Sequence, residues 1–168
     1  MDSPNIPAWA SSSVWYQIYP LGFFDCSPQN DHTEPQEDKL SALAAWYDYL
    51  EELGVGVILF NPLFESDSHG YDTTDYFDVD RRLGTVAAFR KVVQELHARN
   101  IRVVLDGVFN HTGRNHKAFL DCREHGLQSE YATWYKLRSG NSLCGDSFDY
   151  DAWEGHYNLP ELNLEHPG

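Results

Sequence analysis

The sequence lacks several features that define large classes of protein. Its 168 residues include only three cysteines, at positions 26, 122 and 144, and none forms a C-x-x-C pair. This pattern argues against a cysteine metal site and favours free thiols in a reducing compartment. The longest apolar run, around residues 57–60, is far too short to cross a bilayer. Residues 1–13 contain neither the basic nor the apolar part of a secretory signal, so we expect a cytoplasmic protein.

Positive charge is also scarce. The chain has 12 Lys and Arg against 26 Asp and Glu, a formal net charge of −14. A chain this acidic repels phosphate backbones and anionic lipids, so neither nucleic acid nor a membrane surface is an expected partner. There is no P-loop, no G-x-S-x-G and no G-x-G-x-x-G motif. The acidic series at Asp72, Asp75, Asp78 and Asp80 lacks the Gly and final Glu of an EF-hand loop, so we interpret it as a solvated, turn-forming loop.

The residues that are present predict a globular α/β protein, because 42% are hydrophobic and 14% aromatic. Alternating strands and helices are expected in the order strand, helix, strand, helix, strand, at residues 14–19, 38–53, 55–60, 86–96 and 101–109. Gly54 is expected to end the first helix, and Thr85 to cap the second. The run at residues 55–60 is apolar throughout, which suits a strand buried on both faces of a parallel sheet.

Two segments have no such periodicity. A long loop is predicted from Asn61 to Thr85, between the second strand and the second helix. From Asn110 the pattern breaks again, and few helix or strand signals remain after about Arg123. We interpret residues 110–168 as an irregular excursion inserted after the third strand.

Unusual residues follow the predicted strands, where parallel α/β folds bind their ligands. Tyr71, in "HGYDTTDY", is either a stacking platform for a sugar or a loop aromatic that packs over the sheet edge. His111 is either a hydrogen-bond donor to a ligand or a histidine satisfied by neighbouring backbone. Asp106 is either a general acid or base or a buried acid that anchors the loop, and we favour the structural role.

Five segments resemble the alpha-amylase superfamily, glycoside hydrolase family 13, in order and spacing. They are "VWYQIYPLGF", "GVGVILFNPLFES", "HGYDTTDYFDVD", "IRVVLDGVFNH" and "LPELN". The match is most similar to the neopullulanase and cyclomaltodextrinase-like members. The resemblance implies an α/β fold: residues 1–109 are the N-terminal part of a (β/α)8 barrel, with about three strands, and residues 110–168 are a domain B-like insertion.

The resemblance also implies roles for individual residues. Tyr71 matches the aromatic that stacks on the sugar at the cleavage subsite, and His111 matches a histidine that hydrogen-bonds the same sugar. His69 matches a substrate contact of some relatives. Asp106 matches an acid that supports the site, and Asn110 matches a calcium ligand of many alpha-amylases. No cofactor is expected to be required, and Ca²⁺ is left open because it is often absent from the neopullulanase-like branch.

The catalytic carboxylates of the family are not expected in this chain. A retaining glycosidase needs two carboxyl groups about 5 Å apart. In the family these are an Asp and a Glu on later strands, with a third Asp after them, all corresponding to positions beyond Gly168. We therefore expect an α-glucan or maltooligosaccharide binder that is inactive alone. The tempting acids Asp149, Asp151 and Glu154 are interpreted as part of an exposed loop.

Three strands would leave apolar surface uncovered, so we expect the chain to be marginally stable alone and completed by another chain or by a homodimer. A stable monomer that unfolds cooperatively would contradict this expectation. Two rival interpretations remain: a non-catalytic carbohydrate-binding or scaffold protein built on the amylase fold, and an unrelated small α/β binding module.

Overall fold

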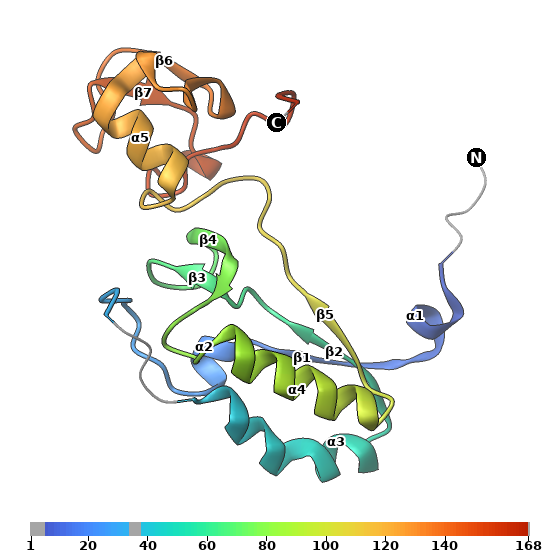
Figure 1. The fold of residues 1–168 in the computed structure, drawn as a ribbon. Helices are drawn as coiled ribbons and strands as arrows, with labels where there is room; N and C mark the ends of the chain where they lie inside the picture. Colours follow the sequence, from blue (N-terminus) through green and yellow to red (C-terminus); the bar gives the residue numbers. More distant parts are fainter. Residues whose placement is uncertain (1–5, 34–37, 168) are drawn as a thin grey trace.

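The computed structural model describes residues 6–33 and 38–167, and its centre is a three-stranded parallel sheet (Figure 1). The strands are β1 (Val14–Ile18), β2 (Val55–Phe60) and β5 (Arg102–Leu105), in the order β1-β2-β5. Ile18 pairs with Phe60, and Phe60 pairs with Leu105. The carboxyl ends of all three strands therefore lie level at one edge. The predicted parallel sheet is confirmed, although the third strand ends at Leu105, well before residue 109.

Helices cover one face of this sheet (Figure 1). The predicted helix at residues 38–53 is two elements, a 3-10 helix (Leu40–Trp46) followed by α3 (Tyr47–Glu52). Gly54 ends it with a φ of +73°, as predicted. The second helix, α4 (Val86–Ala98), begins where expected, because Thr85 Oγ1 accepts the backbone N–H of Ala88 at 3.1 Å.

Most of the large core lies between the sheet and these helices. Its buried side chains come mainly from β1, β2 and the helices, and include Leu43, Leu50, Ile58, Phe60 and Leu96, whereas β5 contributes only the partly buried Val103. Strand β2 has buried residues at both odd and even positions, from Val55 and Val57 to Ile58 and Phe60, as the apolar run predicted. The short helix α1 (Ala8–Ser12) precedes β1, and the short helix α2 (Pro20–Phe23) follows it.

The predicted loop from Asn61 to Thr85 is wrong, because it contains a hairpin. Strands β3 (Phe64–Ser66) and β4 (Thr73–Val79) pair antiparallel, with irregular register. β3 has only three residues and its buried side chains Glu65 and Ser66 are polar, so no alternation of apolar residues marks it.

The acidic series is only in part solvated as the sequence predicted, since Asp75 and Asp78 are exposed. Asp72 and Asp80 are buried, at 6% and 0% exposure. Asp80 receives two hydrogen bonds from the Arg82 guanidinium, at 2.8 and 2.6 Å. Burial alone would lower the pKa of Arg82, but the hydrogen bond and charge of Asp80 outweigh it and raise that pKa. The acid is buried because an arginine is buried with it.

The segment after Asn110 is more regular than predicted. It forms helix α5 (Lys117–His125) and a hairpin of β6 (Leu137–Ser139) and β7 (Phe148–Tyr150), grouped apart from the sheet (Figure 1). Three 3-10 turns connect these elements, at Gly126–Gln128, Ala132–Trp134 and Trp153–Gly155. This segment has its own hydrophobic cluster, which includes Phe119, Phe148 and Tyr150.

His116, which caps α5, makes the stability of the fold depend on pH. Its Nδ1 accepts the backbone N–H of Ala118 at 3.4 Å, and burial, followed by the charge of Lys117, lowers its pKa below 6.5. As the pH falls, the unfolded chain therefore binds a proton at His116 at a higher pH than the folded chain does. Stability is complete above about pH 6.5 and is lost as the pH decreases through the folded pKa.

We therefore expect urea denaturation to give a lower free energy of unfolding at pH 5.5 than at pH 7.5. His116→Asn keeps an acceptor at the helix cap but does not titrate. This variant should lose less stability over the same range. An equal loss in both proteins would contradict the role assigned to His116.

Both edges of the sheet are unpaired within the described part of the chain, since β1 and β5 each have β2 as their only strand neighbour there. Large apolar side chains are exposed along these edges: Val14, Trp15, Leu105 and Phe109. No helix among the described residues is both long and apolar enough to traverse a bilayer.

Candidate functional site

Polar side chains converge where the three parallel strands end. Asn61, directly after β2, is their centre. Its Oδ1 accepts a hydrogen bond from Gln17 Nε2 of β1 at 2.8 Å, and its Nδ2 donates to the Tyr71 hydroxyl at 2.7 Å and to Asp106 Oδ2 at 3.3 Å. Asn61 thus links β1, the β3–β4 hairpin and the residue after β5. Sequence reasoning did not single it out, although its place at the end of an apolar strand was a usable signal.

Tyr71 and His111, two of the predicted sugar contacts, are brought together. His111 Nε2 lies 3.0 Å from the backbone carbonyl oxygen of Tyr71. His111 is 5% exposed, whereas Tyr71 is 37% exposed. The hydroxyl of Tyr71 is held by Asn61. The pair therefore presents an accessible aromatic ring beside a fixed imidazole.

Burial lowers the pKa of His111 more than the hydrogen bond to Tyr71 raises it. The imidazole is therefore neutral at pH 7, with the proton assigned to Nε2, which donates to the Tyr71 carbonyl oxygen. Nδ1 is then an acceptor, and the Asn110 amide lies 3.5 Å from it. Asn110 itself is exposed.

A partly buried tyrosine that sequence reasoning missed fixes the loop carrying His111. The Tyr76 hydroxyl, from β4, lies 2.5 Å from the carbonyl oxygen of Val108 and 3.1 Å from that of His111. Burial raises the pKa of Tyr76 to about 12, so the hydroxyl keeps its proton. The hairpin thus holds the loop after β5 in place.

The "LPELN" segment completes the site from the other side. Thr112 N–H donates to the carbonyl oxygen of Pro160 at 3.1 Å, and Leu162 N–H donates to that of Asn110 at 2.9 Å. His111 and Glu161 form the antiparallel bridge between them. Two of the motifs that carry the resemblance are therefore in direct contact.

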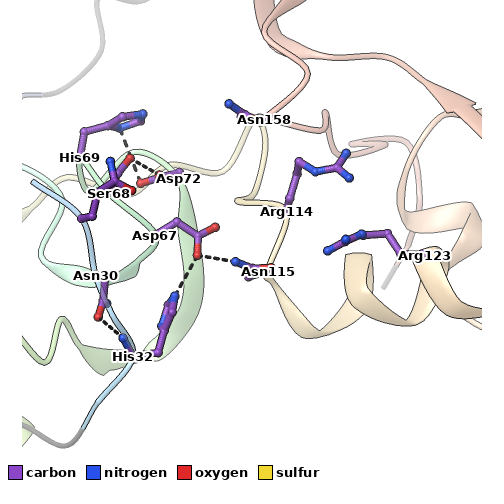
Figure 2. A pocket seen from close by; sticks show the side chains of 11 residues that line it. Asn30, His32, Asp67, Ser68, His69, Asp72, Arg114, Asn115, Arg123 and Asn158 are labelled. Atoms are coloured by element: carbon purple, nitrogen blue, oxygen red, sulfur yellow. Dashed lines mark hydrogen bonds and ion pairs between the residues drawn. The ribbon is translucent and has the colours of Figure 1, made fainter. Parts of the chain in front are cut away.

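His69 stands at the rim, next to a polar cavity of about 610 Å³ (Figure 2). Its Nδ1 accepts the Tyr71 backbone N–H at 3.2 Å, and its side chain is 52% exposed. Asp72 lies behind it, with Oδ1 3.7 Å from His69 Nδ1 and Oδ2 bound to Ser68. Asn115, close to α5, reaches across to Asp67 at 2.8 Å, so the cavity lies between the hairpin and the α5 segment.

Asp106 has the structural surroundings that we favoured, and its partner is the side-chain amide of Asn61. It is partly buried, its carboxylate accepts from Asn61, and its backbone N–H donates to the Phe60 carbonyl oxygen at 2.8 Å. The interpretation of Asp149 as part of an exposed loop is wrong, because it lies in strand β7 and is partly buried. Arg138 binds both Asp149 and Asp151. Glu154 is exposed, as expected.

In parallel α/β folds, ligands are bound at the edge where the strands end, and here polar and aromatic side chains converge at that edge. The chain belongs to the alpha-amylase family, because residues 17–166 match the model of the alpha amylase catalytic domain. The α/β elements are consistent with part of the barrel of this family.

Named relatives agree with this assignment. Maltogenic alpha-amylase of Bacillus acidopullulyticus is 34% identical and is matched by 96% of this chain, and neopullulanase 2 of Thermoactinomyces vulgaris is 40% identical over the same share. Among solved structures, the cyclic alpha-maltosyl-(1→6)-maltose hydrolase of Arthrobacter globiformis has a TM-score of 0.80 at 32% identity, covering 97% of this chain and 40% of that one. The chain spans about 30% of the length of the two curated relatives.

Proposed function

We propose that this chain forms part of the sugar-binding cleft of a retaining glycoside hydrolase that acts on α-glucosidic bonds of starch-like glucans, maltooligosaccharides or cyclodextrins. The observation that carries the proposal is the exposed ring of Tyr71 beside the buried, neutral His111 at the carboxyl edge of the sheet. A pyranose has C–H bonds on its face and hydroxyl groups around its rim. A flat apolar ring next to fixed polar groups is complementary to such a ligand.

Each predicted residue has a role in this proposal. Tyr71 stacks on a glucose ring, and His69 contacts it from the rim. His111 accepts a hydrogen bond from a sugar hydroxyl at Nδ1, because its Nε2 is committed to the Tyr71 carbonyl oxygen. Asp106 and Asn110 support the site: Asp106 holds Asn61, which holds the Tyr71 hydroxyl, and Asn110 lies beside the His111 ring.

The catalytic carboxyl pair is proposed to come from residues outside this chain. Retaining hydrolysis needs a nucleophile and an acid/base about 5–5.5 Å apart on either side of the scissile bond. Asp106 is committed to Asn61, and Asp149 and Asp151 are paired with Arg138. The chain by itself is therefore proposed to bind α-glucans without cleaving them.

The same proposal divides the chain at residues 109 and 110, into a partial barrel and a domain B-like segment. Two separate hydrophobic clusters support this division. We propose no required cofactor. Whether Asn110 helps to bind Ca²⁺ stays open, because backbone carbonyl and amide oxygens also serve as ligands of this ion.

The unpaired sheet edges support a proposed partner, and the name of a relative supports a proposed location. A complementing chain, or a second copy of this one, is proposed to cover the unpaired edges of β1 and β5. A cytoplasmic location is supported by a Bacillus subtilis relative, 36% identical, whose name is intracellular maltogenic amylase.

The test is titration calorimetry of the purified chain with maltoheptaose and β-cyclodextrin, with cellohexaose as the control for linkage. Released reducing sugar is measured in parallel. We expect α-glucan binding without hydrolysis. Failure to bind either α-glucan would reject the proposed cleft. Hydrolysis by the chain alone would reject the proposal that the catalytic carboxylates come from outside this chain. It would make Asp106, Asp149 and Glu154 catalytic candidates.

A further inference from the structure

Trp153 is an exposed aromatic that contacts the proposed site from the C-terminal segment. Its ring centroid lies 5.6 Å from that of His111, with 37° between the planes, and the indole is 39% exposed. His156 also stacks against it, at 5.9 Å and 29°. None of the roles assigned so far uses this ring. A large apolar surface open to solvent beside a ligand site points to a contact with the ligand.

The loop that carries Trp153 is closed at its base. Ala152 and Pro160 form an antiparallel bridge, and the Trp153 backbone N–H donates to the Leu159 carbonyl oxygen at 3.0 Å. Within the loop, the His156 N–H donates to the carbonyl oxygen of Trp153 at 2.8 Å. A closed loop of this kind holds the indole in one place, so a ligand would not have to order it.

The base of the loop is also bound to the segment after β5 that carries His111. Thr112 N–H donates to Pro160 O, so the loop and the His111 segment are held together as one unit. The turn itself requires a left-handed backbone, with φ of +50° at Glu154 and +82° at Gly155. Glu154 adopts this unfavourable conformation directly after Trp153, in the turn that presents the indole.

We infer that Trp153 is a second sugar-stacking platform, which binds the glucose unit next to the one on Tyr71. The inference rests on the proposed function. The imidazole of His111 lies between the two: its Nε2 contacts the Tyr71 backbone and its face contacts the indole. A single sugar engages Tyr71 and His111. A second, α-linked unit reaches Trp153, so this residue selects ligands of at least two glucose units.

The test compares the dissociation constants of glucose, maltose and maltotriose, measured by calorimetry, for the unchanged chain and for Trp153→Ala. The matched control is Trp9→Ala, because Trp9 is 37% exposed but packs on Trp15 and Arg102, near the starts of β1 and β5, whereas the His111 loop follows the end of β5. We expect Trp153→Ala to weaken maltotriose binding about tenfold and to change glucose binding by less than about twofold. Trp9→Ala should leave the three constants unchanged.

The outcomes separate this inference from the proposal on which it depends. If the unchanged chain binds none of the three sugars, the proposed function fails. If it binds them and Trp153→Ala binds them equally well, only the inference is overturned. An equal loss for glucose and maltotriose would also overturn it, because Trp153 would then act only by covering His111. Trp153→Phe keeps a flat ring and should retain most of the maltotriose affinity, which excludes misfolding as the cause of the loss.

Discussion

Replacing Arg82 with alanine is expected to lower the free energy of unfolding by about 3–5 kcal/mol, because the substitution leaves Asp80 charged and unpaired in the interior. Asp80 is fully buried, and its only other side-chain partner among the described residues is Ser66 Oγ, at 2.8 Å. Arg82 also donates to the carbonyl oxygens of Ser27 and Ser68, at 2.8 and 2.7 Å. The substitution therefore releases three segments at once. Since whole domains are stable by only about 5–15 kcal/mol, this loss removes a large part of the total stability.

The matched control is Arg138→Ala. Arg138 also binds two carboxylates, those of Asp149 and Asp151, but its side chain is 48% exposed. Water and salt screen these ion pairs, so Arg138→Ala should lower the free energy of unfolding much less than Arg82→Ala does. Urea denaturation followed by circular dichroism measures both. Equal losses in the two variants would show that burial does not decide the strength of the Asp80 pair.

Replacing Tyr71 with alanine is expected to weaken maltoheptaose binding by about 2 kcal/mol, or roughly 30-fold, because it removes the largest apolar surface that the sugar would cover. Tyr71→Phe separates the ring from the hydroxyl. It keeps the stacking face and loses only the hydrogen bond from Asn61, which is worth about 1 kcal/mol. The order of affinity should be unchanged chain, then Tyr71→Phe, then Tyr71→Ala.

Calorimetry at pH 7.5, where His111 is neutral, measures these affinities. The near-ultraviolet circular dichroism of each variant controls for the fold. If Tyr71→Phe lost as much affinity as Tyr71→Ala, the hydroxyl and not the ring would carry recognition, and the stacking role would be wrong. Unchanged binding by Tyr71→Ala would move the sugar site away from this edge of the sheet.

Periodic patterns predicted the elements that pack against one large apolar surface. The strand at residues 55–60 and helix α4 were predicted closely, because their apolar side chains face the core at regular intervals. Helix α5 was missed. Its nine residues bury only Ala118, Phe119 and Cys122, too few to establish a period, and its cap is a histidine.

The hairpin could not be predicted for a different reason. Its burial depends on pairs that are distant in the sequence, such as Glu65, which is buried and accepts from Asn30 and Arg81. A polar residue is buried when its partner arrives in three dimensions, and a local pattern does not contain that information. The same holds for the site. Tyr71 and His111 were identified from their positions, but the link through Asn61 appears only when three strand ends meet.

The unpaired edges of the sheet determine which residues a completing strand can deliver. β5 runs parallel to β2 and ends at Leu105, one residue before Asp106. A strand added beside β5 in the same direction would bring its last residue to the level of Asp106, next to the sugar contacts. An antiparallel strand would bring its first residue there instead. The direction of an added strand, as well as its sequence, would decide whether a carboxylate reaches the bound sugar.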